Sequence, residues 1–385
     1  MSTAAPILLV GVGGAGSSLV GRLAGSVPDT ARCLAVDADA AALAACGVAE
    51  QVQLGRSSLR GLGAGGETRL GADAAEAETS ELRRRLAGAP VVVVVAGLGG
   101  GIGGGAAPVL AALAAETGAT VLALATLPFA HEGERRLASA RDALVALHRA
   151  AHGTVVLRND ALLQLAPATA PVSELFAETG RWISAAIEAI SGFFAQGALL
   201  PLDPGALRSL LPSPGSRAAF STGRAEGEGA VLAAARAALA SPLLPHGPEA
   251  GRHEHLLVQV VGGPGLTTGD CQAAVAALRS ELGGDRITLL GARIDAADPA
   301  SARVSFLAAS PAPVAPAPVA APPSPSRGRK GARPAAPSPQ QLFSFAQEEN
   351  LRRGLFGTSA PNLFNGEDVD VPTYLRKGIR LPSAD

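Results

Sequence analysis

The stretch Pro90 to Gly118, PVVVVVAGLGGGIGGGAAPVLAALAAETG, restricts the possible folds more than any other part of the chain. Five consecutive valines predict a strand that is buried on both faces, and the alanine-rich run after the glycines predicts a helix. Seven glycines stand between positions 97 and 105, although each glycine costs about 0.5 to 1 kcal/mol relative to alanine in regular structure. A loop this rich in glycine indicates a backbone that closely approaches another group.

Apolar runs and alanine-rich stretches alternate along the first half of the chain. The runs ILLVGV, CLAVDAD, TVLALAT and TVVLRND begin at positions 7, 33, 120 and 154, and each precedes a turn or a helical pattern. This alternation predicts a parallel, doubly wound α/β sheet. A long helical pattern covers Phe176 to Phe194. A helix at 231–240 and strands at 255–263, 287–294 and 302–309 then predict a second α/β unit at about 210–309.

The chain has 385 residues, of which 48% are hydrophobic, and a formal net charge of −1. These totals allow a large core and provide no overall field to attract nucleic acid or an anionic membrane surface. No run reaches the roughly 18 consecutive apolar residues of a membrane span, and the N-terminus lacks the basic segment of a secretion signal. We therefore expect a soluble cytoplasmic protein with no nucleic-acid partner and no direct membrane insertion.

Histidines and cysteines form no metal-site pattern. His148 and His152 are spaced as neighbours on one helix face, and His253 and His255 form an HxH pair, but neither pair has an adjoining third ligand. The three cysteines fit no zinc spacing. No metal ion held by the protein alone is expected.

The composition changes at Ser310. Residues 310–339 consist mostly of proline, alanine, serine and basic residues, which cannot bury enough apolar surface to fold. We expect a disordered linker over 310–340 with extended polyproline character. The tail over 341–385 regains hydrophobic residues and ends in a patterned peptide.

The first glycine loop, GVGGAG at 11–16, matches GxGxxG, and Asp37 closes the next predicted strand about 20 residues later. Alone, this pattern is typical of a dinucleotide site, in which a helix N-terminus holds pyrophosphate and the acid binds ribose; a purely structural turn is the alternative. Two more glycine loops, GLGAGGETRLG at 61–71 and GLGGGIGGG at 97–105, favour a triphosphate over a nicotinamide cofactor. No GKS or GKT occurs, so the chain has no P-loop.

Three loops in this order resemble FtsZ, the bacterial tubulin homologue, over about residues 1–309 and again in the tail. The family signature GGGTGTG appears as GGGIGGG, and AVDADAAAL at 35–43 is similar to AVNTDAQAL. LPFAHEGERRL at 127–137 is similar to KPFxFEGxxRM, and RNDALLQL at 158–165 is similar to PNDxLL. The resemblance implies a tubulin/FtsZ-like fold with a Rossmann-like, parallel-sheet GTP-binding domain, a central helix and a second α/β domain.

The resemblance also implies a site for GTP or GDP, with Mg²⁺ held through the nucleotide. Backbone amides would bind the phosphates, Glu132 the ribose, and Arg136 the base and sugar. Asn159 would lie at the sugar and base end, and Phe176 would stack on guanine. The implied nucleotide-binding residues are Gly13, Gly14, Gly16, Ser18, Asp37, Gly63, Ala64, Gly65, Gly99, Gly100, Gly101, Ile102, Gly103, Gly104, Glu132, Arg136, Asn159, Phe176 and Gly180.

Two departures from the family pattern concern this site. Ile102 and Gly104 replace the two threonines of the glycine loop, so two hydroxyls are lost. Gly180 stands where the family has an asparagine or aspartate that reads the edge of guanine. Because guanine offers donors there, Glu178 or Thr179 is the alternative acceptor.

A third departure lies after the central helix. The family reads NxDxxD in a loop that acts on the nucleotide of the neighbouring subunit, whereas this chain reads PLDPGA at 201–206. The resemblance makes Asp203 a catalytic residue in trans, but Ala206 replaces the last acid. Because phosphoryl transfer depends on positioning and electrostatics, we expect slow or absent GTP hydrolysis.

The tail peptide DVDVPTYLRKG at 368–378 is similar to DIPAFLR, the family's docking peptide for membrane-tethering partners. The resemblance implies that an FtsA-like or ZipA-like division protein binds this peptide. The implied partner-binding residues are Asp370, Pro372, Tyr374, Leu375 and Arg376.

We interpret the chain as a divergent, filament-forming, GTP-binding cell division protein. The expected divisions are a nucleotide domain at 1–175, a central helix and its loop at 176–209, an α/β domain at 210–309, the linker and the tail. Subunits are expected to stack head to tail into a homopolymer at the mid-cell division ring. A hydrolysis-poor scaffold that co-assembles with another homologue and, more remotely, a Rossmann-type oxidoreductase remain as alternatives.

Overall fold

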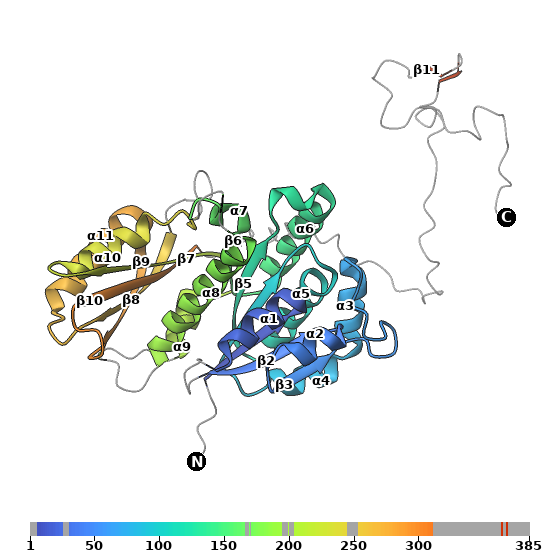
Figure 1. The fold of residues 1–385 in the computed structure, drawn as a ribbon, viewed down its shortest axis with the longest axis horizontal. Coiled ribbons are helices and arrows are strands. Elements are labelled where there is room, and N and C mark those ends of the chain that lie inside the picture. The colour runs from blue at the N-terminus through green and yellow to red at the C-terminus, as the bar shows by residue number, and fades with distance from the viewer. Residues whose placement is uncertain are drawn as a thin grey trace, which may run out of the picture. The chain divides into compact units, whose positions relative to one another are not determined.

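The computed structural model describes residues 6–25, 31–165, 169, 171–194, 199, 204–244 and 253–310, together with the backbone of 363–364 and 367–368. The chain divides into two units, residues 1–317 and 318–385. In the second unit, β11 (Leu363–Phe364) pairs antiparallel with β12 (Glu367–Asp368). All the other described elements belong to the first unit (Figure 1).

The described residues of the first unit form one mixed sheet of ten strands in the order β3-β2-β1-β4-β5-β6-β7-β10-β8-β9. Neighbours from β3 to β7 pair in parallel, as do β8 and β9, whereas β10 runs antiparallel to β7 and β8. This mostly parallel order confirms the predicted α/β class. The strands are β1 (Ile7–Val12), β2 (Ala31–Asp37), β3 (Glu50–Gln53), β4 (Val91–Gly97), β5 (Thr120–Leu127), β6 (Gly153–Arg158), β7 (Ser216–Glu226), β8 (His253–Gly262), β9 (Gly283–Ile294) and β10 (Ser301–Ser310).

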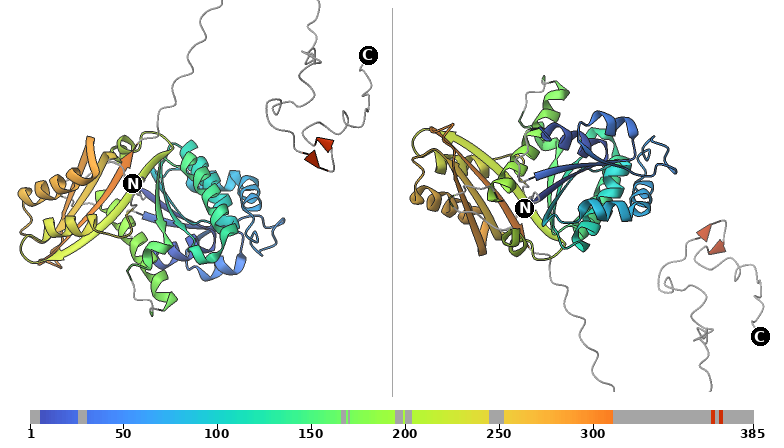
Figure 2. Two further views of the ribbon diagram at one scale, coloured as in Figure 1. Left: turned by 90° about the horizontal axis from the view of Figure 1, so that it is seen from above. Right: turned by 90° about the horizontal axis from the view of Figure 1, so that it is seen from below.

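Helices cover both faces of the parallel part of the sheet (Figure 2). α1 (Gly13–Leu23), α2 (Ala40–Ala45) and α8 (Val172–Phe194) pack on one face, and α3 (Thr68–Ala77), α4 (Thr79–Leu86), α5 (Gly101–Glu116) and α6 (Glu134–Ala150) pack on the other. A short 3₁₀ turn (Ala130–Glu132), α7 (Asn159–Leu162) and α9 (Pro204–Leu210) complete this part. Within the described ranges, no helix combines the length and the apolar character needed to cross a membrane.

The valine run forms β4, as predicted, and every residue from Val91 to Val95 is 0% exposed. Val92 and Val94 join the core beneath α5, whereas Val91, Val93 and Val95 join the core beneath α1 and α8. Successive side chains of a strand point to opposite faces, so a strand between two helical layers needs apolar residues at every position.

α8 lies on one face of the sheet, where the parallel part meets the last four strands in the sheet order, β7, β10, β8 and β9 (Figure 1). Trp182 and Ile183 of this helix join the core that also contains Phe220 of β7, Leu257 of β8 and Leu307 of β10. α10 (Ala230–Leu239) and α11 (Thr268–Leu282) cover the other face of these strands. α8 is therefore packed against both parts of the sheet.

Candidate nucleotide-binding site

Five strands of the parallel part end at one edge of the sheet, since β2, β1, β4, β5 and β6 are parallel neighbours. The strand order reverses between β1 and β4. β1 leads into α1 on one face, and β4 leads into α5 on the opposite face. Ligands of open α/β sheets bind at such a switch point, beyond the carboxyl ends of the strands.

The first turns of α1 and α5 meet at this switch point. Gly13 has a φ of 71°, and a Cβ added to it would lie 2.7 Å from the backbone nitrogen of Gly103. A Cβ on Gly97 would lie 2.8 Å from the Cβ of Ala15. Neither helix has a side-chain cap at its N-terminus. Two uncapped helix N-termini thus lie together, an arrangement that suits a polyphosphate.

The loop at 61–67 packs against the start of α5. A Cβ on Gly101 would lie 2.7 Å from the Cβ of Ala64, which is buried. On either side of Ala64, Gly63 and Gly65 have φ values of 75° and 56°, and added Cβ atoms would meet nothing within 4 Å. This third loop therefore adds exposed, left-handed backbone beside the α5 N-terminus.

Arg136 contacts the glycine loop from α6, and Glu132 holds Arg136 from the turn after β5. A Cβ on Gly99 would lie 2.8 Å from the Cγ of Arg136. Arg136 Nη1 lies 3.0 Å from Glu132 Oε2, and Glu132 Oε1 accepts a hydrogen bond from the backbone N–H of Phe129 at 2.7 Å. The two side chains that the resemblance assigns to ribose and base therefore hold each other beside the loop.

Phe129 and Phe176 mark the end of the site that the resemblance assigns to the base. Their ring centroids are 6.1 Å apart, edge to face, and Phe176 is 46% exposed whereas Phe129 is buried. Asn159 is also buried, and its side-chain oxygen has no hydrogen-bond partner. The carboxylate of Asp160 accepts a hydrogen bond from the N–H of Ala130 at 3.0 Å. Asp160 was not predicted, although its place beside Asn159 in the RND stretch was a usable signal.

α8 offers no free acceptor for a guanine edge at 178–180. A Cβ on Gly180 would meet no atom within 4 Å. Glu178 Oε2 accepts from Arg181 Nε at 3.0 Å, and this hydrogen bond lowers the pKa of the Glu178 carboxyl. Thr179 is 5% exposed. The two alternative acceptors are therefore engaged or buried, and the position beside them is empty.

Packing explains both lost threonines of the glycine loop. Ile102 is 6% exposed and belongs to the core beneath α5. A Cβ on Gly104 would lie 2.9 Å from the Cγ2 of Thr68 and 3.3 Å from the Cβ of Ala143. A hydroxyl side chain at 104 would require a shift of Thr68.

The other predicted residues of these loops lie on α1 and at the start of α5. Gly14 and Ser18 are exposed on α1, whereas a Cβ on Gly16 would overlap the carbonyl oxygen of Val95. Gly100 is the N-cap of α5. Gly16 thus sets the distance between helix and sheet, and Gly14, Ser18 and Gly100 lie where a ligand could reach them.

Asp37 closes β2 and is only 3% exposed. Its Oδ1 accepts from the backbone N–H groups of Ala38 at 2.7 Å and Asp39 at 3.3 Å, whereas its Oδ2 has no partner. Burial raises the pKa of this carboxyl. A buried carboxylate oxygen without a donor suits a hard cation, so Asp37 fits the Mg²⁺ expected with the nucleotide.

In the part of the chain that the structure describes, no group of three His, Cys, Asp or Glu residues could hold a metal ion by itself. The predicted shared helix face of His148 and His152 was wrong, because α6 ends at Ala150. His152 is buried, and its Nδ1 accepts a hydrogen bond from the N–H of Val121 at 3.1 Å. Its role is to pair with the backbone of β5.

Several predicted functional residues lie outside the described residues. They are Asp203 and the tail residues Asp370, Pro372, Tyr374, Leu375 and Arg376. Ala206 lies in the first turn of α9, three residues after Asp203 in the sequence.

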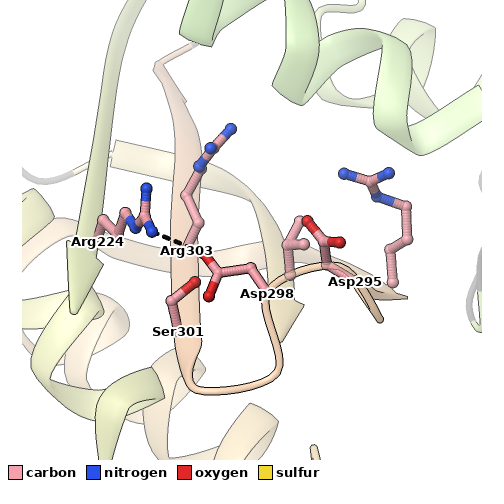
Figure 3. A pocket seen from close by; sticks show the side chains of 7 residues that line it. Arg224, Asp295, Asp298, Ser301 and Arg303 are labelled. Atoms are coloured by element: carbon pink, nitrogen blue, oxygen red, sulfur yellow. Dashed lines mark hydrogen bonds and ion pairs between the residues drawn. The ribbon is translucent and has the colours of Figure 1, made fainter. Parts of the chain in front are cut away.

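A cavity of about 40 Å³ lies where β7, β8 and β9 end and β10 begins (Figure 3). Arg224 of β7 stands directly opposite Arg303 of β10 across this cavity's floor, a pairing of like charges that destabilises a sheet. Asp298 pairs with Arg224 at 2.6 Å, and Glu188 of α8 pairs with Arg303 at 2.7 Å. Arg293 is the third arginine of the lining, and Asp295 is its second aspartate. Together with Glu188, three acids therefore match the three arginines, and the cavity does not indicate an anion site.

Comparisons with known proteins agree with this architecture. The GTPase domain of the Tubulin/FtsZ family matches residues 6–167, and the C-terminal domain of the FtsZ family matches residues 216–310. Cell division protein FtsZ of Methanothermobacter thermautotrophicus is 34% identical over 290 residues, 75% of this chain and 75% of that protein. Cell division protein FtsZ 2 of Rhizobium meliloti is 31% identical over 302 residues, 78% of this chain and 87% of that protein. A solved, empty FtsZ dimer from M. jannaschii is 29% identical with a TM-score of 0.72, covering 80% of this chain and 89% of that one.

Proposed function

The chain belongs to the FtsZ family, and from this premise we propose that it is a GTP-binding cell division protein that assembles head to tail into filaments at the division site. The observation that carries the proposal is the convergence of three glycine loops at one sheet edge. Gly13 lies against Gly103, and Ala64 lies against Gly101. A nicotinamide dinucleotide has no need of the two additional loops, so an oxidoreductase is disfavoured.

GTP would lie across the switch point between β1 and β4. Its phosphates would meet the uncapped first turns of α1 and α5, and its sugar and base would extend along Glu132 and Arg136 toward Phe176. The contact from Gly99 to Arg136 and the ring contact from Phe129 to Phe176 are joined through Glu132, which contacts both Arg136 and Phe129. The proposed residue roles are those expected from the sequence.

Head-to-tail assembly is supported by the two ends of α8. Phe176, at the nucleotide end, lies near the start of this 23-residue helix, and α9 with Ala206 follows its end. At a rise of about 1.5 Å per residue, α8 extends roughly 27 Å from Phe176 to its end at Phe194. A contact between the α9 end of one subunit and the nucleotide end of the next joins unlike surfaces, and such contacts propagate into open filaments.

A filament that hydrolyses GTP slowly or not at all is the second candidate within the same family. Ala206 cannot position a water molecule, and Ile102 and Gly104 contribute no hydroxyl. A chain that binds nucleotide without turning it over would form static filaments, alone or with a homologue that supplies the missing acid. Its tail would still dock with a membrane-tethering partner through the residues at 370–376.

Sedimentation and light scattering with GTP, GDP and ATP test the assembly proposal. Pelleting and scattering should rise with GTP above a critical protein concentration and should stay low with GDP. A chain that remains monomeric across a wide range of protein and GTP concentrations would refute filament formation.

Phosphate release in the same samples tests the account of slow turnover. Ala206→Asp restores an acid in the first turn of α9, where the helix dipole also favours negative charge, and we expect it to raise phosphate release per assembled subunit. Ala206→Asn is the matched control, because it has a similar size and no charge. Equal turnover in the wild type and both variants would show that position 206 does not limit hydrolysis.

A further inference from the structure

The carboxylate of Asp37 lies beside the first turn of α1, on one side of the proposed phosphate site, and one of its oxygens is unused. The side chain is 3% exposed. Oδ1 is satisfied by two backbone N–H groups, and Oδ2 has neither a hydrogen bond nor an ion pair. A buried charged oxygen of this kind requires an explanation, because nearly all buried polar atoms have a partner.

The free oxygen faces the first turn of α1. A Cβ added to Gly14 would lie 3.8 Å from Asp37 Oδ2, the only contact within 4 Å that this Cβ would make. Gly14 itself is exposed and belongs to the uncapped helix start. With no side chain at position 14, nothing from α1 stands between the carboxylate and a phosphate at that helix start.

The charges around Asp37 make direct contact with a phosphate unfavourable. Within the described residues, no ion pair or hydrogen bond joins Asp37 to an arginine, lysine or histidine. The nearest ionisable neighbour along the chain is Asp39, whose Oδ1 caps α2 by accepting from the N–H groups of Ala41 and Ala42. A carboxylate and a phosphate side by side repel each other unless a cation lies between them.

On the α5 side of the proposed site, two positions lack a side-chain oxygen that could bind a cation. Ile102 is buried in the core, and the place of a side chain at Gly104 is occupied by Thr68. Mg²⁺ in phosphate sites is bound through one or two carboxylates together with the phosphates and water. Asp37 provides such a carboxylate from the β2 side.

We propose that Asp37 holds, through its free Oδ2, the divalent cation that accompanies the nucleotide triphosphate, so that nucleotide binding by this chain depends on Mg²⁺ through a residue of β2. The inference rests on the proposed nucleotide site and adds the group that neutralises the phosphates there. It also gives a reason for an acid at position 37, where the family pattern has a neutral asparagine.

The test uses the full-length chain and a fluorescent, slowly hydrolysed GTP analogue, titrated with Mg²⁺ and with EDTA at protein concentrations below assembly. The wild type should bind the analogue about 10- to 100-fold more weakly in EDTA, a loss of the size seen when the surroundings of a bound metal are perturbed. Asp37→Asn should bind with nearly the same affinity in both conditions. In EDTA it should bind more tightly than the wild type, because the repulsion is removed.

Mn²⁺ provides a direct readout that does not depend on turnover. In electron paramagnetic resonance titrations of the protein with the analogue, Asp37→Asn should weaken Mn²⁺ binding about 10- to 100-fold. Asp39→Asn is the matched control, because it removes the same charge two residues away and asparagine remains a good N-cap for α2. It should keep the wild-type Mn²⁺ affinity.

The outcomes separate this inference from the proposed function. If the wild type binds the analogue equally well with Mg²⁺ and with EDTA, the cation role is refuted and the nucleotide site stands. The cation role is also refuted if Asp39→Asn, and not Asp37→Asn, weakens Mn²⁺ binding. It is refuted again if the affinity for the analogue does not depend on Mg²⁺ but rises on acidification, because a protonated Asp37 would then explain the binding. If no nucleotide binds in either condition, both the nucleotide site and this inference are refuted.

Discussion

Gly13→Ala tests whether the starts of α1 and α5 meet as closely as the structure shows. The backbone at position 13 has a φ of 71°, a conformation that costs an alanine about 1 to 2 kcal/mol. The new Cβ would also lie 2.7 Å from the nitrogen and 3.1 Å from the Cα of Gly103. Because these are backbone atoms, the contact cannot be relieved by a rotamer change, and crowding of this kind costs about 1 to 3 kcal/mol.

Together these terms predict that Gly13→Ala is destabilised by about 2 to 5 kcal/mol. At about 2 °C per kcal/mol for a large domain, the melting temperature without nucleotide should fall by about 4 to 10 °C. Thermal unfolding followed by circular dichroism measures this change, and urea unfolding followed by the fluorescence of Trp182 measures it independently. GTP affinity should fall with stability, since the two helix starts would be pushed apart.

Gly14→Ala is the matched control, one residue further along the same turn. Its φ is not positive, and its added Cβ would meet only Asp37 Oδ2 at an ordinary 3.8 Å. Alanine at a helical position should leave stability unchanged or raise it by up to about 1 kcal/mol. If Gly13→Ala melts at the wild-type temperature, or if both variants lose the same stability, the close approach of the two helix starts is refuted.

Three further predictions concern single side chains. Gly180→Asp should raise the preference for GTP over ATP by about tenfold or more in competition titrations, because position 180 has room for an acceptor. Gly180→Ala, which adds no acceptor, should leave the preference unchanged. An unchanged ratio in Gly180→Asp would show that other residues select the base. Asp37→Asn should stabilise the nucleotide-free protein at pH 7 by about 1 to 3 kcal/mol, because it removes a buried charged oxygen without a partner. Burial raises the pKa of the Asp37 carboxyl in the folded state, so this group destabilises the fold only at pH values where it is charged. The difference in stability between Asp37→Asn and the wild type should therefore close as the pH falls. A difference that widens in acid would contradict this sign. Burial lowers the pKa of His152, so the folded state binds its proton less readily than the unfolded state and stability should fall as the pH drops below about 6.5. Urea midpoints at pH 7.5 and 5.5 should differ less in His152→Gln than in the wild type, whereas His131→Gln, at an exposed position, should keep the wild-type difference.

The class of fold and its main strands follow from local patterns. β1, β4 and β5 are found where apolar β-branched runs predicted them, because a strand covered on both faces leaves an unbroken apolar record in the sequence. α8 begins at Val172, four residues before the predicted start at Phe176, directly after Pro171. Helix ends depend on such neighbours more than on periodicity.

β7 was not predicted, for a reason that lies in its neighbours. Its sequence SRAAFSTGRAE is polar and contains a glycine, which resembles a turn. Gly223 is required in the middle of this strand because a Cβ there would overlap the carbonyl oxygen of Ala234 in α10. The strand exists because β6 and β10 pair with it, and those contacts are distant in sequence.

The candidate site was likewise predictable only in part. Glycine spacing and family resemblance pointed to the loops and to the residues that line them, and the structure brings Gly13, Ala64 and Arg136 against the start of α5. The ion pair between Glu178 and Arg181 is an i,i+3 pair on α8, which the helical spacing allowed. The free oxygen of Asp37 depends on which donors lie within reach in three dimensions, so this feature required coordinates.

The seam between the two parts of the sheet has a consequence for synthesis on the ribosome. β6 pairs with β7 through only three residue pairs, Gly153 to Val155 with Ser216 to Ala218, and β7 begins about 60 residues after β6 ends. At about 5 to 20 residues per second, the nascent first half would wait roughly 3 to 12 s with the outer edge of β6 unpaired. An open edge is a template for pairing with another chain. On crowded polysomes, neighbouring nascent copies of this protein would therefore meet with matching open edges, and chaperone protection would be needed most between the synthesis of β6 and that of β7.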